Sequence, residues 1–186
     1  MNKKLINNNV VDYPFSSYRM AWTYIKSDYI RYNNSEISFW GFLQTKFQCR
    51  GFHYSVWMRL SGVKGFFQPL CRLRLHQLSS KYGIQIQPET KIGMGLYIGH
   101  GIGIVCSPTA VIGKNVNLSQ FTTIGTNKGK AATIGDNVYI GPNVCLVEDV
   151  VIGNNAVIGA GAVVIKDVPS NATAVGVPAR NIIKTR

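Results

Sequence analysis

From Ile86 onward an aliphatic residue recurs every six positions, and this period constrains the fold more than any other feature of the sequence. Three series show it, over residues 86–104, 112–124 and 134–164. A period of six matches neither the 3.6-residue period of an α-helix nor the two-residue alternation of a strand. It is typical of a parallel β-helix with short strands and sharp corners, in which each aliphatic residue stacks on its counterpart in the next coil.

The period is interrupted twice, and each interruption predicts a loop. Ile104 and Ile112 are eight residues apart, so we expect two inserted residues within CSPTAV. Ile124 and Ile134 are ten residues apart, so we expect four inserted residues within GTNKGKAAT. A solenoid expels extra residues as loops, and such loops often build a binding face.

Residues 1–83 lack the period and form a separate region in this interpretation, with residues 84–186 as the β-helix domain and its C-terminal tail. Segments 35–48, 50–61 and 65–83 have the apolar spacing of amphipathic helices. Of the net charge of +12, residues 1–83 carry +9, from twelve Lys and Arg against three Asp and Glu. The fold class expected is therefore mainly β, with a basic, aromatic-rich α-helical region at the N-terminus.

Two roles for this helical region stay open. It can cover the end of the β-helix with its aromatic side chains, or residues 38–80 can contact a membrane that carries anionic lipid. A nucleic-acid partner is not expected, because the basic residues follow no RNA- or DNA-binding motif.

Cysteines, histidines and apolar runs limit the other possibilities. The four cysteines have no CxxC spacing, the N-terminus lacks the apolar segment of a signal peptide, and no apolar run is long enough to span a bilayer. We therefore expect a reduced, cytoplasmic protein, with the inner face of the membrane as a further location. His100 is the only histidine of the repeat region, so no three-histidine metal site is expected.

The repeats together with IGAGAVVIKDVPSNATAVGVPAR resemble the hexapeptide-repeat acyltransferases. This resemblance covers about residues 84–183 and implies a left-handed parallel β-helix, a homotrimer, and acetyl-CoA as the acetyl donor. It places CoA in a groove between subunits, against Gly141 and Pro142 on one coil and Gly159 and Ala160 on the next. Cationic side chains suit the phosphates of the nucleotide, and the implied pair is Lys166 and Arg180.

Within that superfamily, QIQPETKIGMGLYIGHGIGIV is most similar to the serine acetyltransferase branch. The resemblance makes His100 the general base, a role that suits a neutral imidazole near pH 7. Gln85 falls where the branch has the aspartate that orients this base, and Glu89 is a weaker alternative base. The aspartate before the base is Gly99 here.

Other positions depart from the branch as well. Its Arg-His-Pro segment, which helps to hold serine, falls on Lys130, Ala131 and Ala132. A zwitterion needs charged partners in a dry site, which these positions do not supply. The function expected is therefore an O-acetyltransferase that acts on a sugar hydroxyl in the synthesis of a capsule, exopolysaccharide or O-antigen, nearest to the colanic acid type. Its acceptor would be a free, nucleotide-linked or lipid-linked glycan.

Three alternatives remain open. The first is a serine O-acetyltransferase of cysteine biosynthesis with an altered pocket. The second is an N-acetyltransferase that acts on a nucleotide amino sugar. The third is a β-helix scaffold without catalysis.

Overall fold

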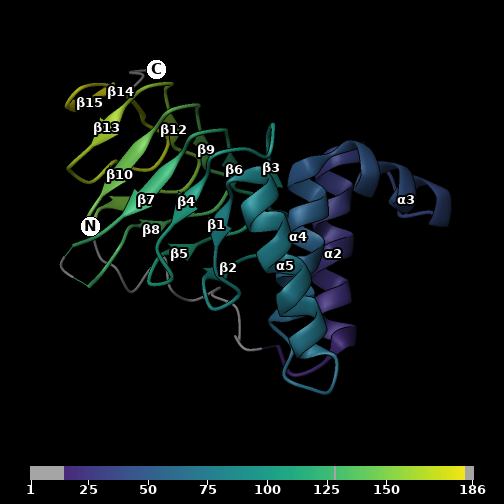
Figure 1. The fold of residues 1–186 in the computed structure, drawn as a ribbon. Helices are drawn as coiled ribbons and strands as arrows, with labels where there is room; N and C mark the ends of the chain where they lie inside the picture. Colours follow the sequence, from purple (N-terminus) through teal and green to yellow (C-terminus); the bar gives the residue numbers. More distant parts are fainter. Residues whose placement is uncertain (1–14, 128, 183–186) are drawn as a thin grey trace.

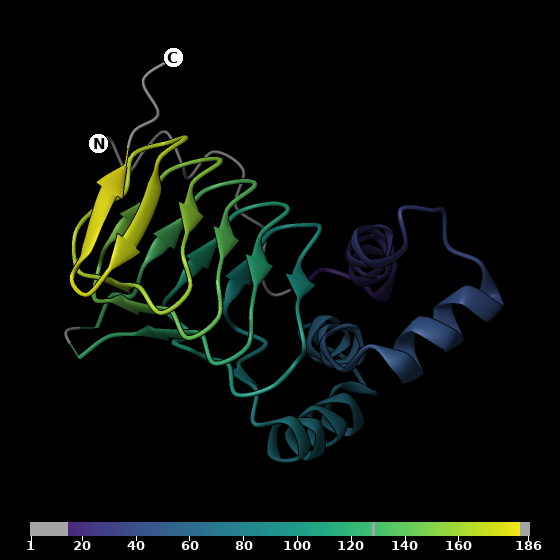
Figure 2. The same cartoon turned by 90° about the horizontal axis from the view of Figure 1, so that it is seen from above.

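The computed structural model describes residues 15–127 and 129–182. A group of helices lies beside one end of a β-helix, and the chain then winds away from the helices toward its C-terminus (Figures 1 and 2). The helices are α2 (Tyr18–Asn33), α3 (Phe39–Gln48), α4 (Arg50–Ser61) and α5 (Gln68–Tyr82).

Two-residue to four-residue strands form the faces of the β-helix. One sheet contains β1 (Gln85–Ile86), β4 (Val105–Cys106), β7 (Thr123–Gly125), β10 (Cys145–Val147) and β13 (Val163–Val164). The second contains β2 (Lys91–Ile92), β5 (Val111–Ile112), β8 (Thr133–Ile134) and β11 (Val151–Ile152). The third contains β3 (Tyr97–Ile98), β6 (Asn117–Leu118), β9 (Tyr139–Ile140), β12 (Val157–Ile158), β14 (Thr173–Gly176) and β15 (Ala179–Ile182), which pairs antiparallel with β14. The predicted parallel β-helix with an N-terminal helical region is confirmed.

The six-residue period has its predicted structural meaning. The second residue of each two-residue strand from β1 to β13 is buried, while most first residues are exposed or half-buried. Val105 pairs with Thr123, eighteen residues on, which is three periods of six. Thr123 pairs with Cys145, twenty-two residues on, so the four-residue insertion before β8 is confirmed.

The position of the two-residue insertion differs from the sequence-based prediction. The inward-facing residue of β4 is Cys106, and Ile104 is a buried corner residue rather than a member of the strand series. The two extra residues therefore lie between Ile98 and Cys106, not in CSPTAV. The prediction was wrong because a small apolar cysteine can take the place of an aliphatic residue in the stack.

The sequence does not predict helix α2. Its buried face includes Ala21, Tyr24, Ile25 and Tyr29, at the 3–4-residue spacing of a helix. The same face also contains a fully buried aspartate, Asp28, which interrupts the apolar pattern. Tyrosine and β-branched residues also weaken the local helical signal.

The first coil of a β-helix exposes an edge of unpaired backbone groups, and two tyrosines satisfy part of this edge. The Tyr54 hydroxyl accepts a hydrogen bond from the Ile86 N–H at 3.1 Å and donates one to the Ile86 carbonyl at 2.9 Å. The Tyr32 hydroxyl likewise accepts a hydrogen bond from the Ile98 N–H at 2.8 Å and donates one to the Ile98 carbonyl at 3.1 Å. Each hydroxyl therefore replaces the backbone partner that a preceding strand would supply.

A buried ion pair satisfies three further backbone groups of this edge. Asp28 and Arg59 are 0% and 3% exposed, with the Arg59 Nε 3.1 Å from an Asp28 carboxylate oxygen. Arg59 also donates to the carbonyls of Ile92 and Gly93 at 2.8 and 2.7 Å. Asp28 accepts the Leu96 N–H at 2.8 Å. Side chains of α2 and α4 thus contact all three strands of the first coil.

This arrangement predicts that Asp28→Ala destabilises the protein strongly. The substitution leaves the Arg59 guanidinium buried without its counter-ion, which costs about 3–5 kcal/mol. Urea unfolding followed by circular dichroism measures the loss. Glu36→Ala, at an exposed acidic residue between α2 and α3, is the matched control and should change the free energy of unfolding by less than about 0.5 kcal/mol. Equal effects of the two substitutions would contradict the role of the pair.

Candidate active site

His100 lies on the corner that contains the two extra residues. This corner joins β3 to β4, and His100 is exposed there with a left-handed backbone φ of 59°. Only a minority of non-glycine residues adopt such a φ, and in this β-helix they mark the corners. The enlarged corner leaves His100 exposed to solvent.

Two glycines let the N-terminus of α4 contact this corner directly. A Cβ on Gly101 would lie 2.5 Å from the Gly51 nitrogen and 2.9 Å from the Arg50 Cβ. A Cβ on Gly51 would lie 2.2 Å from the Ile98 carbonyl oxygen. All three distances are too short for a side chain at either glycine, so the two backbones are in direct contact. The first turn of α4 is thereby held against the residues that precede and follow His100.

A cavity of about 360 Å³ lies at this junction and includes His100 in its wall. Its lining comes from α2, from the end of α3, from the start of α4 and from β3: Tyr32, Gln48, Cys49, Arg50, Gly51, Tyr97 and Ile98, together with His100. Burial raises the pKa of the Cys49 thiol, which favours the protonated form of this cysteine at neutral pH. His100 is therefore the candidate proton acceptor in this wall.

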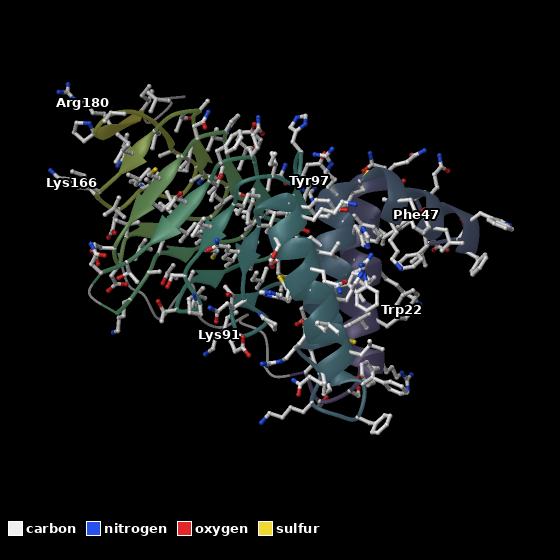
Figure 3. All side chains as sticks on the ribbon, viewed as in Figure 1. Trp22, Phe47, Lys91, Tyr97, Lys166 and Arg180 are labelled. Carbon is white, nitrogen blue, oxygen red and sulfur yellow. The ribbon has the colours of Figure 1, made fainter. Side chains whose placement is uncertain are left out.

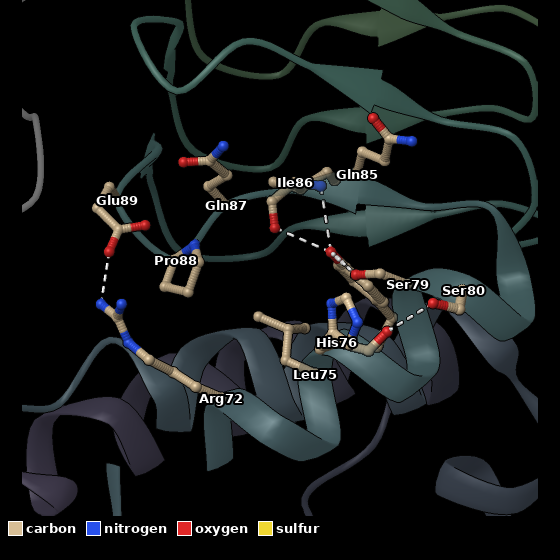
Figure 4. Close-up of a pocket in the computed structure, with 11 residues that line it drawn as sticks. Arg72, Leu75, His76, Ser79, Ser80, Gln85, Ile86, Gln87, Pro88 and Glu89 are labelled. Atoms are coloured by element: carbon tan, nitrogen blue, oxygen red, sulfur yellow. Dashed lines mark hydrogen bonds and ion pairs between the residues drawn. The ribbon is translucent and has the colours of Figure 1, made fainter. Parts of the chain in front are cut away.

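Gln85 lies in the wall of a different cavity. That cavity, of about 500 Å³, is formed by α5 and the segment around β1, and Gln87 and Glu89 also line it (Figure 4). Glu89 is paired there with Arg72, across the cavity from Gln85. Within the described residues no hydrogen bond joins Gln85 to His100, so the orienting role of Gln85 remains a prediction.

Four of the residues expected at CoA lie on the same column of corners as His100. Gly99 follows β3, Gly141 and Pro142 follow β9, and Gly159 and Ala160 follow β12, all in one sheet. The Gly141 N–H donates to the Ile158 carbonyl at 2.9 Å, and the Gly161 N–H donates to the Pro142 carbonyl at 2.8 Å. These bonds stack the two corners. An extended ligand along this column would pass from Ala160 toward His100.

Lys166 and Arg180 lie at the C-terminal end of the β-helix, far from the helices (Figure 3). Both are exposed, Lys166 just after β13 and Arg180 within β15. The structure therefore puts these two cations at the opposite end of the β-helix from His100.

His53 belongs to the helical region and does not line the cavity beside His100. His53 is buried in α4, with its Nδ1 3.3 Å from the Tyr82 hydroxyl. Burial, together with the charges of nearby Lys46, Arg74 and Lys81, lowers the pKa of His53 to about 4.

The described residues contain no candidate metal site and no candidate membrane-spanning helix. In this part of the chain, no group of three or more His, Cys, Asp and Glu could hold a metal ion. None of its helices has both the length and the apolar character that are needed to span a bilayer.

Solved structures share this fold and this arrangement of helices and β-helix. The serine acetyltransferase of Neisseria gonorrhoeae in complex with serine aligns with a TM-score of 0.72 and 30% identity, over 87% of this chain and 69% of that chain. A family model described as bacterial transferase hexapeptide (six repeats) matches residues 131–166. The chain belongs to the hexapeptide-repeat transferases.

This hexapeptide-repeat transferase is similar to serine acetyltransferases in sequence as well. Serine acetyltransferase 1, chloroplastic, of Arabidopsis thaliana is 46% identical over 112 residues, which are 58% of this chain but only 35% of that protein. A serine acetyltransferase structure in complex with CoA aligns with a TM-score of 0.72 and 27% identity, over 89% of this chain and 71% of that chain. This transferase thus spans about a third of the length of the Arabidopsis relative.

The expected function in polysaccharide synthesis is wrong, and with it the glycan acceptor. Curated relatives at 38–47% identity are serine acetyltransferases, and none of the comparisons supports the colanic acid type. The argument against serine depended on Gly99, Gln85 and Ala131, together with Lys130 and Ala132. Gln85 lines another cavity, and both alanines are buried in the β-helix, so these three residues do not show which groups surround His100.

The contact between the corner and α4 yields a testable prediction. Gly101→Ala places a Cβ against α4 and should lower the free energy of unfolding by about 1–3 kcal/mol, through overpacking and left-handed strain. Gly129→Ala is the matched control, because Gly129 also has a positive φ but nothing within 4 Å of its added Cβ. Chemical unfolding of both variants measures the difference. A loss at Gly129 as large as that at Gly101 would show that the close contact is unimportant.

Proposed function

We propose that this chain transfers the acetyl group of acetyl-CoA to the hydroxyl of serine. The observation that carries the proposal is the exposed His100 on an enlarged corner, beside a cavity that α4 completes. The similarity to serine acetyltransferases solved with serine and with CoA supports the two ligands.

In this proposal His100 acts on the acceptor. Its neutral imidazole removes the hydroxyl proton while the serine oxygen attacks the thioester carbonyl carbon. The tetrahedral intermediate then collapses, the carbon–sulfur bond breaks, and the CoA sulfur takes the proton from the imidazolium. The products are O-acetylserine and CoA. Gly99 and Gly101, on either side of His100, leave space for both substrates at the imidazole.

CoA would lie along the column of corners that runs from Ala160 to His100, with Lys166 and Arg180 near its phosphates. We also propose that the chain assembles as a homotrimer, so that a neighbouring subunit closes the CoA groove. Apolar side chains on the outer faces of the β-helix support contact between copies, since Val105, Tyr139 and Val157 are each about 40% exposed.

The membrane contact expected for residues 38–80 remains a prediction, as does a cytoplasmic location at the inner face of a membrane. Helix α3 extends away from the other helices (Figure 2) and carries Phe39, Trp40 and Phe47, each at least 70% exposed. Phe66, between α4 and α5, is 92% exposed. Such aromatic side chains among basic residues support an interfacial role for this region.

The proposal predicts that His100→Ala strongly lowers the rate of serine acetylation. Loss of a general base lowers kcat by about 10²–10⁴-fold. Serine-dependent release of CoA from acetyl-CoA, followed with a thiol reagent, measures the rate. His76→Ala is the matched control, because His76 is exposed but lies in the wall of the other cavity, and it should retain full activity. Serine-dependent turnover in His100→Ala at a rate close to that of the native protein would disprove the assignment.

A further inference from the structure

The cavity beside His100 has a positive character. Of the described residues that line it, Arg50 alone carries a charge at every physiological pH, and none is an aspartate or glutamate. The other polar groups are the Tyr32 and Tyr97 hydroxyls, Gln48, Cys49 and His100. An anionic group is therefore the ligand that this wall favours.

Arg50 is placed by the same contact that places His100. It is the first residue of α4, and its Cβ and carbonyl carbon would lie 2.9 and 3.0 Å from a Cβ on Gly101. The backbones of Arg50 and of the residue that follows His100 thus touch. The two side chains leave neighbouring points and line one cavity.

Among the residues that the structure describes, the Arg50 guanidinium forms no hydrogen bond or ion pair. Four other arginines donate to a protein oxygen, namely Arg31 to Asn117, Arg59 to Asp28, Arg72 to Glu89 and Arg74 to Gln77. Arg50 is exposed and makes no such bond with any described residue. All of its donors are therefore available to a ligand in the cavity.

We infer that Arg50 binds the carboxylate of the acceptor and thereby brings the acceptor hydroxyl to His100. This inference rests on the proposed function and names the part of the substrate that the cavity recognises. A guanidinium binds a carboxylate through two parallel N–H···O bonds, which fix the position of the bound group as well as its charge. The acceptors favoured are hydroxy compounds that carry a carboxylate, serine among them.

Steady-state kinetics with two acceptors tests this role. L-Serine and L-serinamide share the hydroxyl and the amino group, but serinamide lacks the carboxylate. We expect Arg50→Ala to lower kcat/KM for serine about 10- to 100-fold, mainly through KM, and to leave kcat/KM for serinamide nearly unchanged. Arg50→Lys keeps the positive charge but cannot form the two parallel N–H···O bonds, so it should give an intermediate loss of kcat/KM for serine. Arg19→Ala, at an exposed arginine of α2 outside the cavity, is the matched control and should resemble the native protein.

An unchanged KM for serine in Arg50→Ala would overturn the inference, and so would an equal loss with both acceptors. Serine binding to His100→Ala, followed by NMR with and without the added Arg50→Ala change, separates the inference from the proposed function. Binding that weakens with Arg50→Ala supports the carboxylate site even if the native protein does not acetylate serine. Binding that does not weaken overturns the site, whatever the turnover.

Discussion

The first coil of the β-helix depends on side chains that take the place of a strand. Every later coil finds hydrogen-bond partners in the coil before it, whereas the groups at Ile86, Ile92 and Ile98 face the helical region. Tyr54, Tyr32 and the Arg59–Asp28 pair form the hydrogen bonds that a preceding coil would otherwise form with these backbone groups. Unpaired backbone groups at a buried edge are costly, and an open edge invites pairing with other chains. The helices are thus required for the β-helix to begin.

The same helix that closes this edge also forms the candidate site. Tyr54 and Arg59 point from α4 to the first coil, and Gly51, one turn earlier, packs on the carbonyl of Ile98. The corner with His100 begins at the next residue. Stability of the end coil and the geometry around His100 therefore depend on one set of contacts. Two extra residues between Ile98 and Cys106 give that corner the length to reach α4.

The sequence predicts the repeating parts of this structure, but it does not predict the contacts between residues that are far apart along the chain. The six-residue period predicts the β-helix, because every coil meets the same packing requirement. Helix α2 escapes detection, since Asp28 belongs to a buried ion pair whose partner is thirty-one residues away. The two-residue insertion is misplaced because Cys106 is a less obvious stacking residue than Ile104. Arg50 is missed for a similar reason: no spacing along the chain shows that the start of α4 touches Gly101.

Amide hydrogen exchange at the edge of the first coil tests the central claim that helix side chains replace a preceding strand. The amides of Ile86, Leu96 and Ile98 donate to Tyr54, Asp28 and Tyr32, while the amide of Gly99 donates to the Leu118 carbonyl within the β-helix. NMR should find the three edge amides protected to nearly the same degree as Gly99, because all four open only when the coil unfolds. Exchange of the edge amides at the rate of exposed backbone, with Gly99 still protected, would contradict the claim.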